Sequence, residues 1–335
     1  MALLATTNPT LADVAKRMDP QGKIDMIVEI MNQENEVLDS MVWLEANGPM
    51  SHTGTIRTGL PTPTWRKLYG GVQPGRSTTI QVTDTIGMLE AYAEVDKALA
   101  DLNGNTGAFR LSEDRAHIES MSQEFSSKLF YGNEGTLPEA FTGLAPRFNA
   151  KSGALNGSNV ILADSGASGG DQSSVWLIVW GDSTVHGIYP KASQAGLLAR
   201  DLGEVTVENV DGSNGRMQAY RSHYKWNCGL VVKDWRYVVR IANVDTSALT
   251  KNAATGSDLI DVMTQALEVV PSLRKGRAAF YCSRTVRSFL RRQITNKVAA
   301  STLTMENVAG RRVVMFEEVP VYRCDAILNT EAVIS

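Results

Sequence analysis

Residues 166–170, GASGG, fit the G-x-S-x-G spacing that places a nucleophilic serine, here Ser168, at a sharp turn. In that motif a strand precedes the serine and a helix follows it. The segment Asn159–Asp164 has the character of a strand, but the residues after the glycines, DQSSVWLIVW, predict another strand. The pattern therefore favours a Gly/Ser loop between two strands. A soluble serine hydrolase that uses Ser168 remains one candidate function, as the alternative to the function that the rest of the sequence favours.

Metal and cofactor chemistry have weaker signals still. His186 and His223 each fall in a predicted strand, and neither has a Cys, His or acidic neighbour at the spacing of metal ligands. No P-loop or convincing dinucleotide-binding fingerprint occurs. We therefore expect no catalytic residue, no cofactor and no metal, and a protein that is not an enzyme.

The composition excludes several classes of protein. The chain has 335 residues, enough for two or three domains, and 33 Lys+Arg against 36 Asp+Glu give a net charge of −3. This balance argues against an overall basic protein for nucleic acid or membrane surfaces, and no apolar run reaches transmembrane length. The three cysteines have no metal spacing and no secretory signal precedes them, so we expect buried, reduced thiols.

The elements around these residues are more informative, beginning with a segment that we name the ribbon, residues 47–83. It contains six glycines, four prolines and four basic residues, and no acid occurs between Glu45 and Asp84. Thr53–Thr58 and Ser77–Thr83 alternate with the period of strands. We predict a long two-stranded excursion, with a flexible surface loop as the alternative.

The tip of the ribbon carries an apolar cluster that the ribbon itself cannot bury. Exposed apolar clusters usually mark contact sites, and two strands this poor in apolar residues are marginally stable alone. We predict that the ribbon contacts an adjacent subunit, through its basic and apolar residues Arg57, Trp65, Arg66, Lys67, Leu68, Tyr69 and Arg76.

A long amphipathic helix is predicted at Leu111–Tyr131, with Ser112 as its N-cap and Gly132 as a left-handed C-terminal residue. Its apolar stripe is narrow, which suits a helix with one packed face. The stripe consists of Leu111, Ile118, Phe125 and Leu129, flanked by Met121.

Before the ribbon we predict a loose arm at 1–10, a short helix at Leu11–Met18 and helix over the acidic segment Lys23–Glu45. A second acidic segment, 84–101, follows the ribbon. Both acidic segments are candidate partners for basic surfaces of other subunits or domains.

The chain from Ser158 to Val244 is rich in predicted strands. Ser174–Trp180 is a short apolar strand, and Thr184–Tyr189 is expected to pair back with it as a hairpin. Tyr220–Lys233 alternates over about fourteen residues, longer than a common strand. Tyr224 and Trp226 fall on its buried face, with the odd-numbered residues opposite.

The C-terminal part predicts helices and strands in alternation. They are a helix at Ser257–Val270, a strand at Arg277–Cys282, a helix at Arg284–Lys297 capped by Ser283, and strands at Val313–Phe316 and Val319–Tyr322. Arg274–Arg312 contains ten basic residues and one acid. Few aromatic residues suited to base stacking accompany them, so we favour pairing between subunits or domains over nucleic-acid binding. The overall class is α+β, without a βαβ series.

Several stretches resemble the major capsid proteins of tailed bacteriophages with the Hong Kong 97-type fold, and in particular the shell proteins of short-tailed phages of the epsilon-fifteen type. The resemblance extends from about residue 10 to 330. It is carried by RTGLPTPTWRKLYGGV, MSQEFSSKLFYGN, FTGLAPRFN, WLIVWGDSTVHGIYPK and HYKWNCGLVVKDWRYVVRIANV.

The resemblance implies an arrangement of domains and a function. It implies a major capsid protein, assembled in the host bacterial cytoplasm into hexamers and pentamers of an icosahedral head, and located in the virion. It also implies scaffolding, portal and cement or decoration proteins as partners, non-specific contact with packaged DNA, and no membrane. The implied domains are an N-terminal arm and helices at 1–46, an extended loop at 47–83, a peripheral domain at 84–136 with a spine helix at 112–131, a mainly axial domain at 137–310, and returning C-terminal strands at 311–335.

Overall fold

The computed structural model describes residues 33, 35–102, 106–153, 155–164, 166–208, 215–249, 259–295, 303–308 and 311–335. The expectations for the arm, for Leu11–Met18 and for the first part of Lys23–Glu45 lie outside these residues. The described chain forms two compact units. The first contains the described residues of Met88–Ser126 and Gly196–Asn227 together with Gln33, and the second contains those of Glu34–Gly87, Ser127–Ala195 and Cys228–Ser335. No helix in the described residues is long and apolar enough to cross a membrane.

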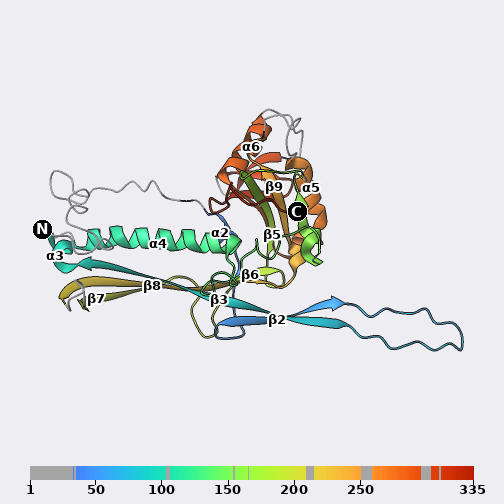
Figure 1. Ribbon diagram of the computed structural model, residues 1–335, viewed down its shortest axis with the longest axis horizontal. Helices are drawn as coiled ribbons and strands as arrows, with labels where there is room; N and C mark the ends of the chain where they lie inside the picture. The colour runs from blue at the N-terminus through green and yellow to red at the C-terminus, as the bar shows by residue number, and fades with distance from the viewer. Residues whose placement is uncertain are drawn as a thin grey trace. The chain divides into compact units, whose positions relative to one another are not determined.

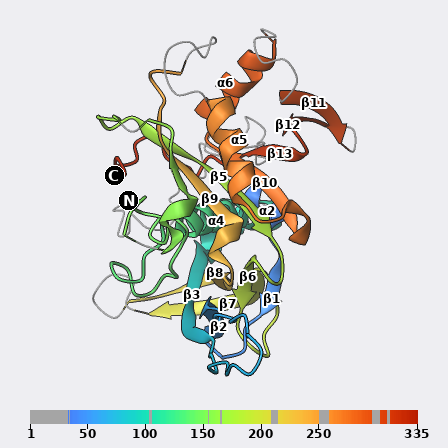
Figure 2. The same ribbon diagram turned by 90° about the vertical axis from the view of Figure 1, so that its right-hand side faces the viewer.

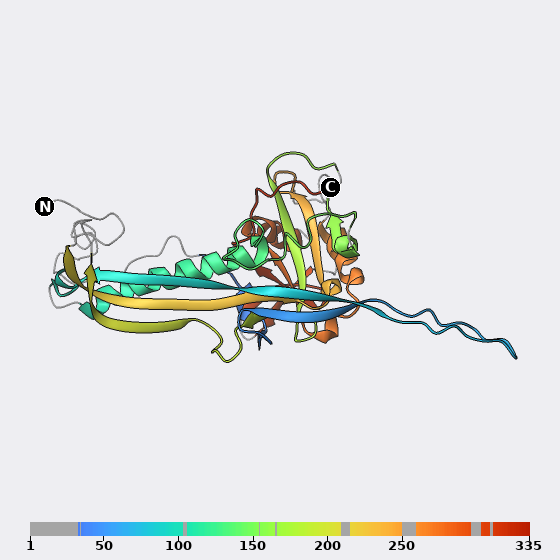
Figure 3. The same ribbon diagram turned by 60° about the horizontal axis from the view of Figure 1, so that its bottom comes forward.

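The first unit is a three-stranded sheet with a helix on one face (Figure 1). The central strand, β8, has β3 on one side and β7 on the other, and these three strands run side by side in Figure 3. The elements are β3 (Thr78–Asp96), α3 (Lys97–Ala100), α4 (Thr106–Tyr131), β7 (Leu198–Glu208) and β8 (Arg216–Val232), of which β3, α4 and β8 continue into the second unit.

The predicted alternation of β8 is confirmed. Tyr224 is buried against Met121 of α4 and Ala93 of β3. Trp226, half-buried on the same face, stacks on Phe125 with 4.5 Å between ring centroids. Because successive side chains of a strand point to opposite faces, the odd-numbered residues of β8 lie on the other side of the sheet.

That other side is a ladder of opposite charges. Glu90 of β3 lies 2.8 Å from the Lys225 ammonium and 3.2 Å from the His223 ring, and Arg221 pairs with Glu94. Hydrogen bonds from Lys225 and His223 hold the pKa of Glu90 below its usual value. Carboxylates of the acidic segment 84–101 therefore have partners within their own chain.

The long helix differs from the prediction at its start. It begins at Thr106, so Ser112 lies inside it and is not an N-cap. Leu111 and Ile118, expected in the packed stripe, are 53% and 40% exposed, whereas Phe109 and Phe125 are buried. A straight helix that crosses a twisted sheet turns different sides toward it along its length, so a single angular stripe predicts only part of the contact.

The C-terminus of the helix also differs from the prediction. Gly132 does not have a left-handed conformation. Its hydrogen atom in place of a side chain leaves room for two carbonyls, because a Cβ there would lie 2.6 Å from Lys128 O and 2.5 Å from Phe141 O. The glycine is required by close packing of the chain and not by its backbone angles.

The second unit is built on a mixed sheet whose strands follow the order β11-β12-β13-β10-β5-β9-β4. Helices α5 and α6 lie beside it (Figure 2). All nine residues of β5 are buried, as expected for a strand covered on both faces. The bounds are β4 (Val160–Leu162), β5 (Gln172–Trp180), β9 (Val238–Asp245), α5 (Leu259–Val269), β10 (Arg277–Cys282), α6 (Arg284–Thr295), β11 (Leu303–Val308), β12 (Arg311–Phe316) and β13 (Val319–Arg323).

The core of this unit confirms the predicted faces of its elements. Val286 and Leu290 of α6 are fully buried, and the Ser283 hydroxyl accepts a hydrogen bond from the Val286 N–H as a cap. The three cysteines are buried, and burial raises the pKa of the Cys282 and Cys324 thiols to about 12. These thiols are therefore protonated and unreactive at neutral pH.

The predicted hairpin of Ser174–Trp180 with Thr184–Tyr189 is wrong. Strand β6 (Val185–Tyr189) meets β5 at one parallel pair, Trp180 with Val185. It pairs instead with β1 (Trp43–Glu45) and with the end of β8. The Thr184 hydroxyl donates to the Val179 carbonyl at 2.7 Å inside the turn, and the two edges of β5 are paired with β10 and β9.

The end of the predicted helix Lys23–Glu45 is also wrong. Only α2 (Val37–Ser40) is helical near this end, and Trp43–Glu45 is strand β1. Short apolar runs do not distinguish helix from strand, and here pairing with β6 decides. Three short 3-10 helices complete the described elements: η2 (Leu155–Asn159), η3 (Trp235–Tyr237) and η4 (Leu273–Lys275).

A buried ion pair lies at the centre of the second unit. Arg240 of β9 and Glu331 are both 5% exposed and lie 2.7 Å apart. The Arg240 guanidinium also donates to Ser174 Oγ at 3.1 Å and to the Phe148 carbonyl at 2.9 Å. Glu331 accepts further hydrogen bonds from the Ser174 and Tyr131 hydroxyls, and both charges are therefore well satisfied.

Substitution Arg240→Met is expected to destabilise the subunit by about 3–5 kcal/mol, because it leaves the Glu331 carboxylate buried without its partner. The measurement is urea unfolding of dissociated subunits at pH 7. Arg236→Met is the matched control, since Arg236 is exposed and pairs with Asp234, for a change of about 1 kcal/mol or less. Equal losses for the two variants would contradict the role given to the buried pair.

Candidate functional site

Most residues of the ribbon are exposed in the described structure. Strand β2 (Ser51–Gly59) pairs antiparallel with the first part of β3, from Ser51 opposite Thr85 to Gly59 opposite Thr78. The two predicted strands of the ribbon are thus confirmed. Figure 3 shows residues 60–77 running on past the paired strands.

The paired strands are held by polar contacts. The Thr53 and Thr83 hydroxyls lie 3.4 Å apart across the strands, and those of Thr58 and Thr78 lie 3.3 Å apart. The Asn47 side chain bonds both the N–H and the carbonyl of Thr53 at the base. These hydrogen bonds fix the register but bury little apolar area, so they add little to stability.

The tip exposes the apolar residues that the sequence places there. A tight turn, in which the Gly70 N–H donates to the Lys67 carbonyl at 3.0 Å, holds Tyr69 in the left-handed conformation with φ at 61°. Trp65 and Tyr69 are 102% and 97% exposed, and Leu68 is 82% exposed. Three large apolar side chains on one short segment form a patch that the described subunit does not cover.

The four basic residues of the ribbon are also exposed, and in the described residues none of them makes an ion pair. Arg57 borders a cavity of about 630 Å³ between the ribbon and the turn that holds Lys233, Trp235 and Arg236. Arg66, Lys67 and Arg76 belong to the extended segments beyond it. The structure therefore gathers the predicted residues on one projection, with Arg57 near the outer end of the paired strands, opposite Thr79, and the others in the segment beyond them.

The base of the ribbon is anchored by residues that the sequence did not single out. Asp84, which is 6% exposed, bonds the Arg147 guanidinium at 2.7 Å. Arg147 also donates to the carbonyls of Thr142 and Gly143. The pair fixes the point at which the ribbon leaves the core. In the sequence, Asp84 could have been noticed as the first acidic residue after the basic ribbon. Its partner Arg147 could not have been found in this way, because it is 63 residues away.

Two histidines pack together beside this anchor. His52 of β2 and His186 of β6 meet edge to face, with 6.1 Å between ring centroids. His186 is fully buried, and neither ring nitrogen makes a well-formed hydrogen bond. Burial above all, with Lys233 and His52 acting in the same direction and Gly181 and Asp182 opposing them, lowers the pKa of His186 to about 4.

The serine motif has no catalytic context. Ser168 lies exposed in the loop between β4 and β5, so a strand and not a helix follows it. The nucleophile-elbow geometry requires a strand-to-helix turn. The hydrolase alternative therefore has no structural support. The described residues also contain no group of three His, Cys, Asp or Glu side chains placed to hold a metal ion.

Comparison with known proteins gives a consistent result. A profile of the family described as major capsid protein GP7 matches residues 19–335. The solved structure of bacteriophage epsilon15 is 36% identical with a TM-score of 0.77, and the match covers 100% of this chain and 99% of that chain. Comparison with curated protein sequences gives no significant match.

More distant structures have lower scores. The capsid of bacteriophage JBD30 is 10% identical with a TM-score of 0.46, covering 88% of this chain and 91% of that chain. An encapsulin complex from Synechococcus elongatus is 12% identical with a TM-score of 0.44, covering 71% of this chain and 97% of that chain.

The fold is the Hong Kong 97-type α+β fold of tailed-phage shell proteins, as the sequence predicted. The chain belongs to the major capsid protein GP7 family. It is thus a capsid protein, whose copies assemble with one another into the shell of a virion.

Acid is expected to destabilise the subunit through His186. Its folded pKa of about 4 lies below the unfolded value of 6.5, so the folded state binds fewer protons between these values. Stability from this group is complete above about pH 6.5 and is lost as pH falls toward 4, by about 3 kcal/mol in total. His186→Phe should flatten this dependence in urea unfolding measured from pH 7.5 to 4. His117→Gln, on a partly exposed histidine of α4, serves as control and should retain the wild-type slope.

Proposed function

We propose that the chain forms the hexamers and pentamers of an icosahedral head of a tailed double-stranded DNA phage, with the ribbon of each subunit lying on an adjacent copy. Assembly takes place in the host bacterial cytoplasm. Portal, scaffolding and cement proteins are the expected partners, and the enclosed DNA is contacted without sequence specificity. In this role the chain is structural and not catalytic.

One observation carries the proposal for the ribbon: its tip presents Trp65, Leu68 and Tyr69 to solvent in the isolated subunit. A monomeric protein rarely leaves such a cluster uncovered. The chain is a capsid protein, so the surface most available to cover the tip is another copy of itself. Closed symmetric shells repeat one such contact at every subunit.

The charges of the ribbon contribute less than its aromatic residues. Glu90 and Glu94, in the acidic segment proposed as a partner, already bond cations of their own chain. An exposed ion pair contributes about 0.2–1 kcal/mol, whereas burial of one large apolar side chain contributes about 1.5–3 kcal/mol. The contact therefore rests mainly on the apolar tip, and the basic residues guide its approach.

We also propose how the two compact units correspond to the domains that the resemblance implies. The sheet of β3, β7 and β8 with the first part of α4 corresponds to the peripheral domain, and the sheet around β5 to the axial domain. In this assignment the peripheral domain includes residues 196–227 in addition to the predicted 84–136, because they form one compact unit with Met88–Ser126.

Ribbon variants should separate assembly from folding. Trp65→Ala should leave the circular dichroism spectrum unchanged and lower the yield of shells about tenfold or more, because the lost burial is repeated at each subunit. The double variant Arg66→Glu with Lys67→Glu should lower the yield less, with an effect that weakens as salt increases. Shell yield is measured by sedimentation and negative-stain microscopy.

Leu328→Ala is the matched control, since Leu328 is an exposed apolar residue, 49% exposed, away from the ribbon. It should assemble as the wild type does. Normal shell yield from Trp65→Ala, together with normal yield from the double reversal at low salt, would refute the proposed contact.

Substitution Ser168→Ala is expected to leave folding, assembly and shell yield unchanged, because Ser168 is exposed in a loop between strands. The assay is microscopy of shells together with hydrolysis of a chromogenic ester by wild type and variant. An ester-hydrolysis rate that belongs to the purified wild-type protein and disappears in the variant would revive the hydrolase alternative.

A further inference from the structure

A pocket lined almost wholly by arginines lies between α6 and β13 in the second unit. Its volume is about 380 Å³, within the range of small-ligand sites. Its lining consists of Arg284, Arg287, Ser288, Arg291, Arg292 and Arg323. Capsid assembly as derived above uses none of these residues.

The pocket follows from the amphipathic pattern of α6. Val286 and Leu290 are fully buried and turn one side of the helix toward the sheet. Residues 284, 287 and 291, spaced three and four apart, lie on one side of the helix. Arg323 of β13 adds a cation from the neighbouring strand.

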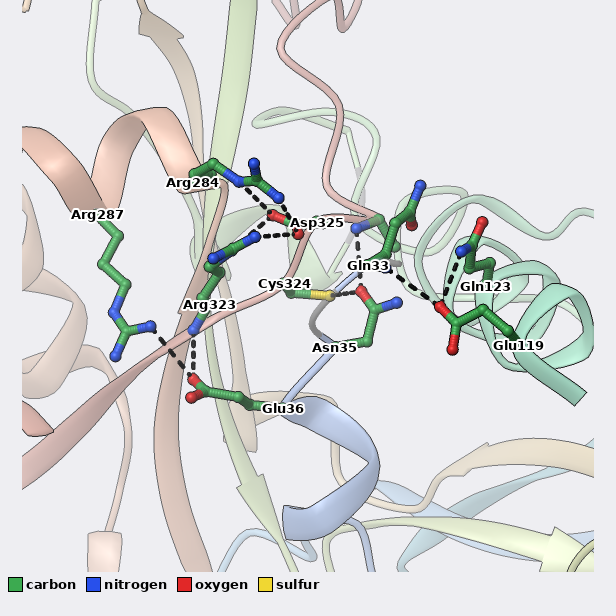
Figure 4. Close-up of polar contacts among 11 residues, drawn as sticks. Gln33, Asn35, Glu36, Glu119, Gln123, Arg284, Arg287, Arg323, Cys324 and Asp325 are labelled. Atoms are coloured by element: carbon green, nitrogen blue, oxygen red, sulfur yellow. Dashed lines mark hydrogen bonds and ion pairs between the residues drawn. The ribbon is translucent and has the colours of Figure 1, made fainter. Parts of the chain in front are cut away.

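Two carboxylates already meet these cations, as Figure 4 shows. Asp325 bonds Arg284 at 2.8 Å and also pairs with Arg323. Glu36 accepts the backbone N–H of Arg323 at 2.7 Å and lies 3.6 Å from the Arg287 guanidinium. Five guanidinium groups thus surround a cavity in which the described carboxylate partners are Asp325 and Glu36.

The guanidinium of Arg287 is incompletely satisfied. Its guanidinium lies farther from Glu36 than a normal hydrogen bond, and its Nε–H is buried without an acceptor. A buried donor without a partner costs about 1–3 kcal/mol. Arg287 also lines the pocket, so an oxygen-bearing anion there would offer its guanidinium a closer acceptor than Glu36.

We propose that this pocket binds clustered phosphate groups, either of a nucleic-acid strand or of a free oligophosphate. Arginine offers a planar fork of donors that matches phosphate oxygens in pairs. Linked phosphates concentrate several negative charges in a small volume, which suits a compact cavity lined by five guanidinium groups. An acidic peptide delivers one charge per side chain, on a backbone that the cavity must also accommodate.

The test uses the full chain in assembled shells, with inorganic tripolyphosphate as the first probe in isothermal titration at low salt. Wild-type shells should bind it saturably. Arg292→Gln should weaken binding about tenfold, the loss expected for one charge-assisted contact. Ser288→Glu, which places a carboxylate in the lining, should abolish binding.

The matched control is Arg277→Gln, which removes one exposed cation of β10 outside the pocket and should bind as the wild type does. Equal affinities in wild type, Arg292→Gln and Arg277→Gln would overturn the proposal. Microscopy of each variant verifies that shells form. If Ser288→Glu shells do not form, the two arginine variants provide the comparison.

Two further probes distinguish the source of the phosphate. Binding of a short single-stranded DNA oligonucleotide with the same dependence on Arg292, in the absence of tripolyphosphate binding, assigns the site to a nucleic-acid backbone. The reverse result assigns it to a free oligophosphate. Arg292-dependent binding of polyglutamate alone, with neither phosphate probe bound, would overturn the phosphate proposal in favour of an acidic protein segment.

Discussion

The buried carboxylate of Glu331 is the point on which the second unit depends. Through Arg240, Ser174 and Tyr131 it connects the C-terminal residues to β9, β5 and the last residue of α4. Withdrawing two charges from water is costly unless each finds its full set of partners. The Arg240 guanidinium meets this condition and also lies 5.0 Å from the centre of the Trp176 ring. These segments are separated in sequence, so the network forms only when all of them are in place.

The ribbon, in contrast to this buried network, is poorly packed. The ribbon holds its register with threonine hydroxyls and a single asparagine, while its tip keeps three large apolar side chains in solvent. The ion pair between Asp84 and Arg147 lies where the ribbon joins the packed core. The subunit is thus well packed at its centre and exposed at its ribbon.

The sequence predicted local features well and long-range partners poorly. The alternation of 220–233, the buried side of α6 and the two strands of the ribbon follow from periods of two and 3.6 residues, and the structure confirms them. The resemblance in stretches such as FTGLAPRFN indicated the family. The pairing of β6 could not be predicted, because a short apolar strand after a turn fits several neighbours equally well. The same limit applies to the charges: Glu90 is 133 residues from His223, and no spacing rule joins them.

The length of β3 has a consequence for the order of folding. One strand of nineteen residues serves two neighbours, β2 along its first part and β8 beyond. Contacts between β2 and β3 join residues about 30 positions apart in the sequence, such as Thr53 and Thr83. The contact of β3 with β8 between Glu90 and His223 joins residues 133 positions apart. Shorter loops close with less loss of entropy and more quickly. The hairpin of β2 and β3 would then form early and hold β3 extended as a template for β8. A shift of one residue in the register of that hairpin would shift all of β3. The charged side chains of β3, Glu90 and Glu94, would then point toward α4 and not toward the opposite face of the sheet.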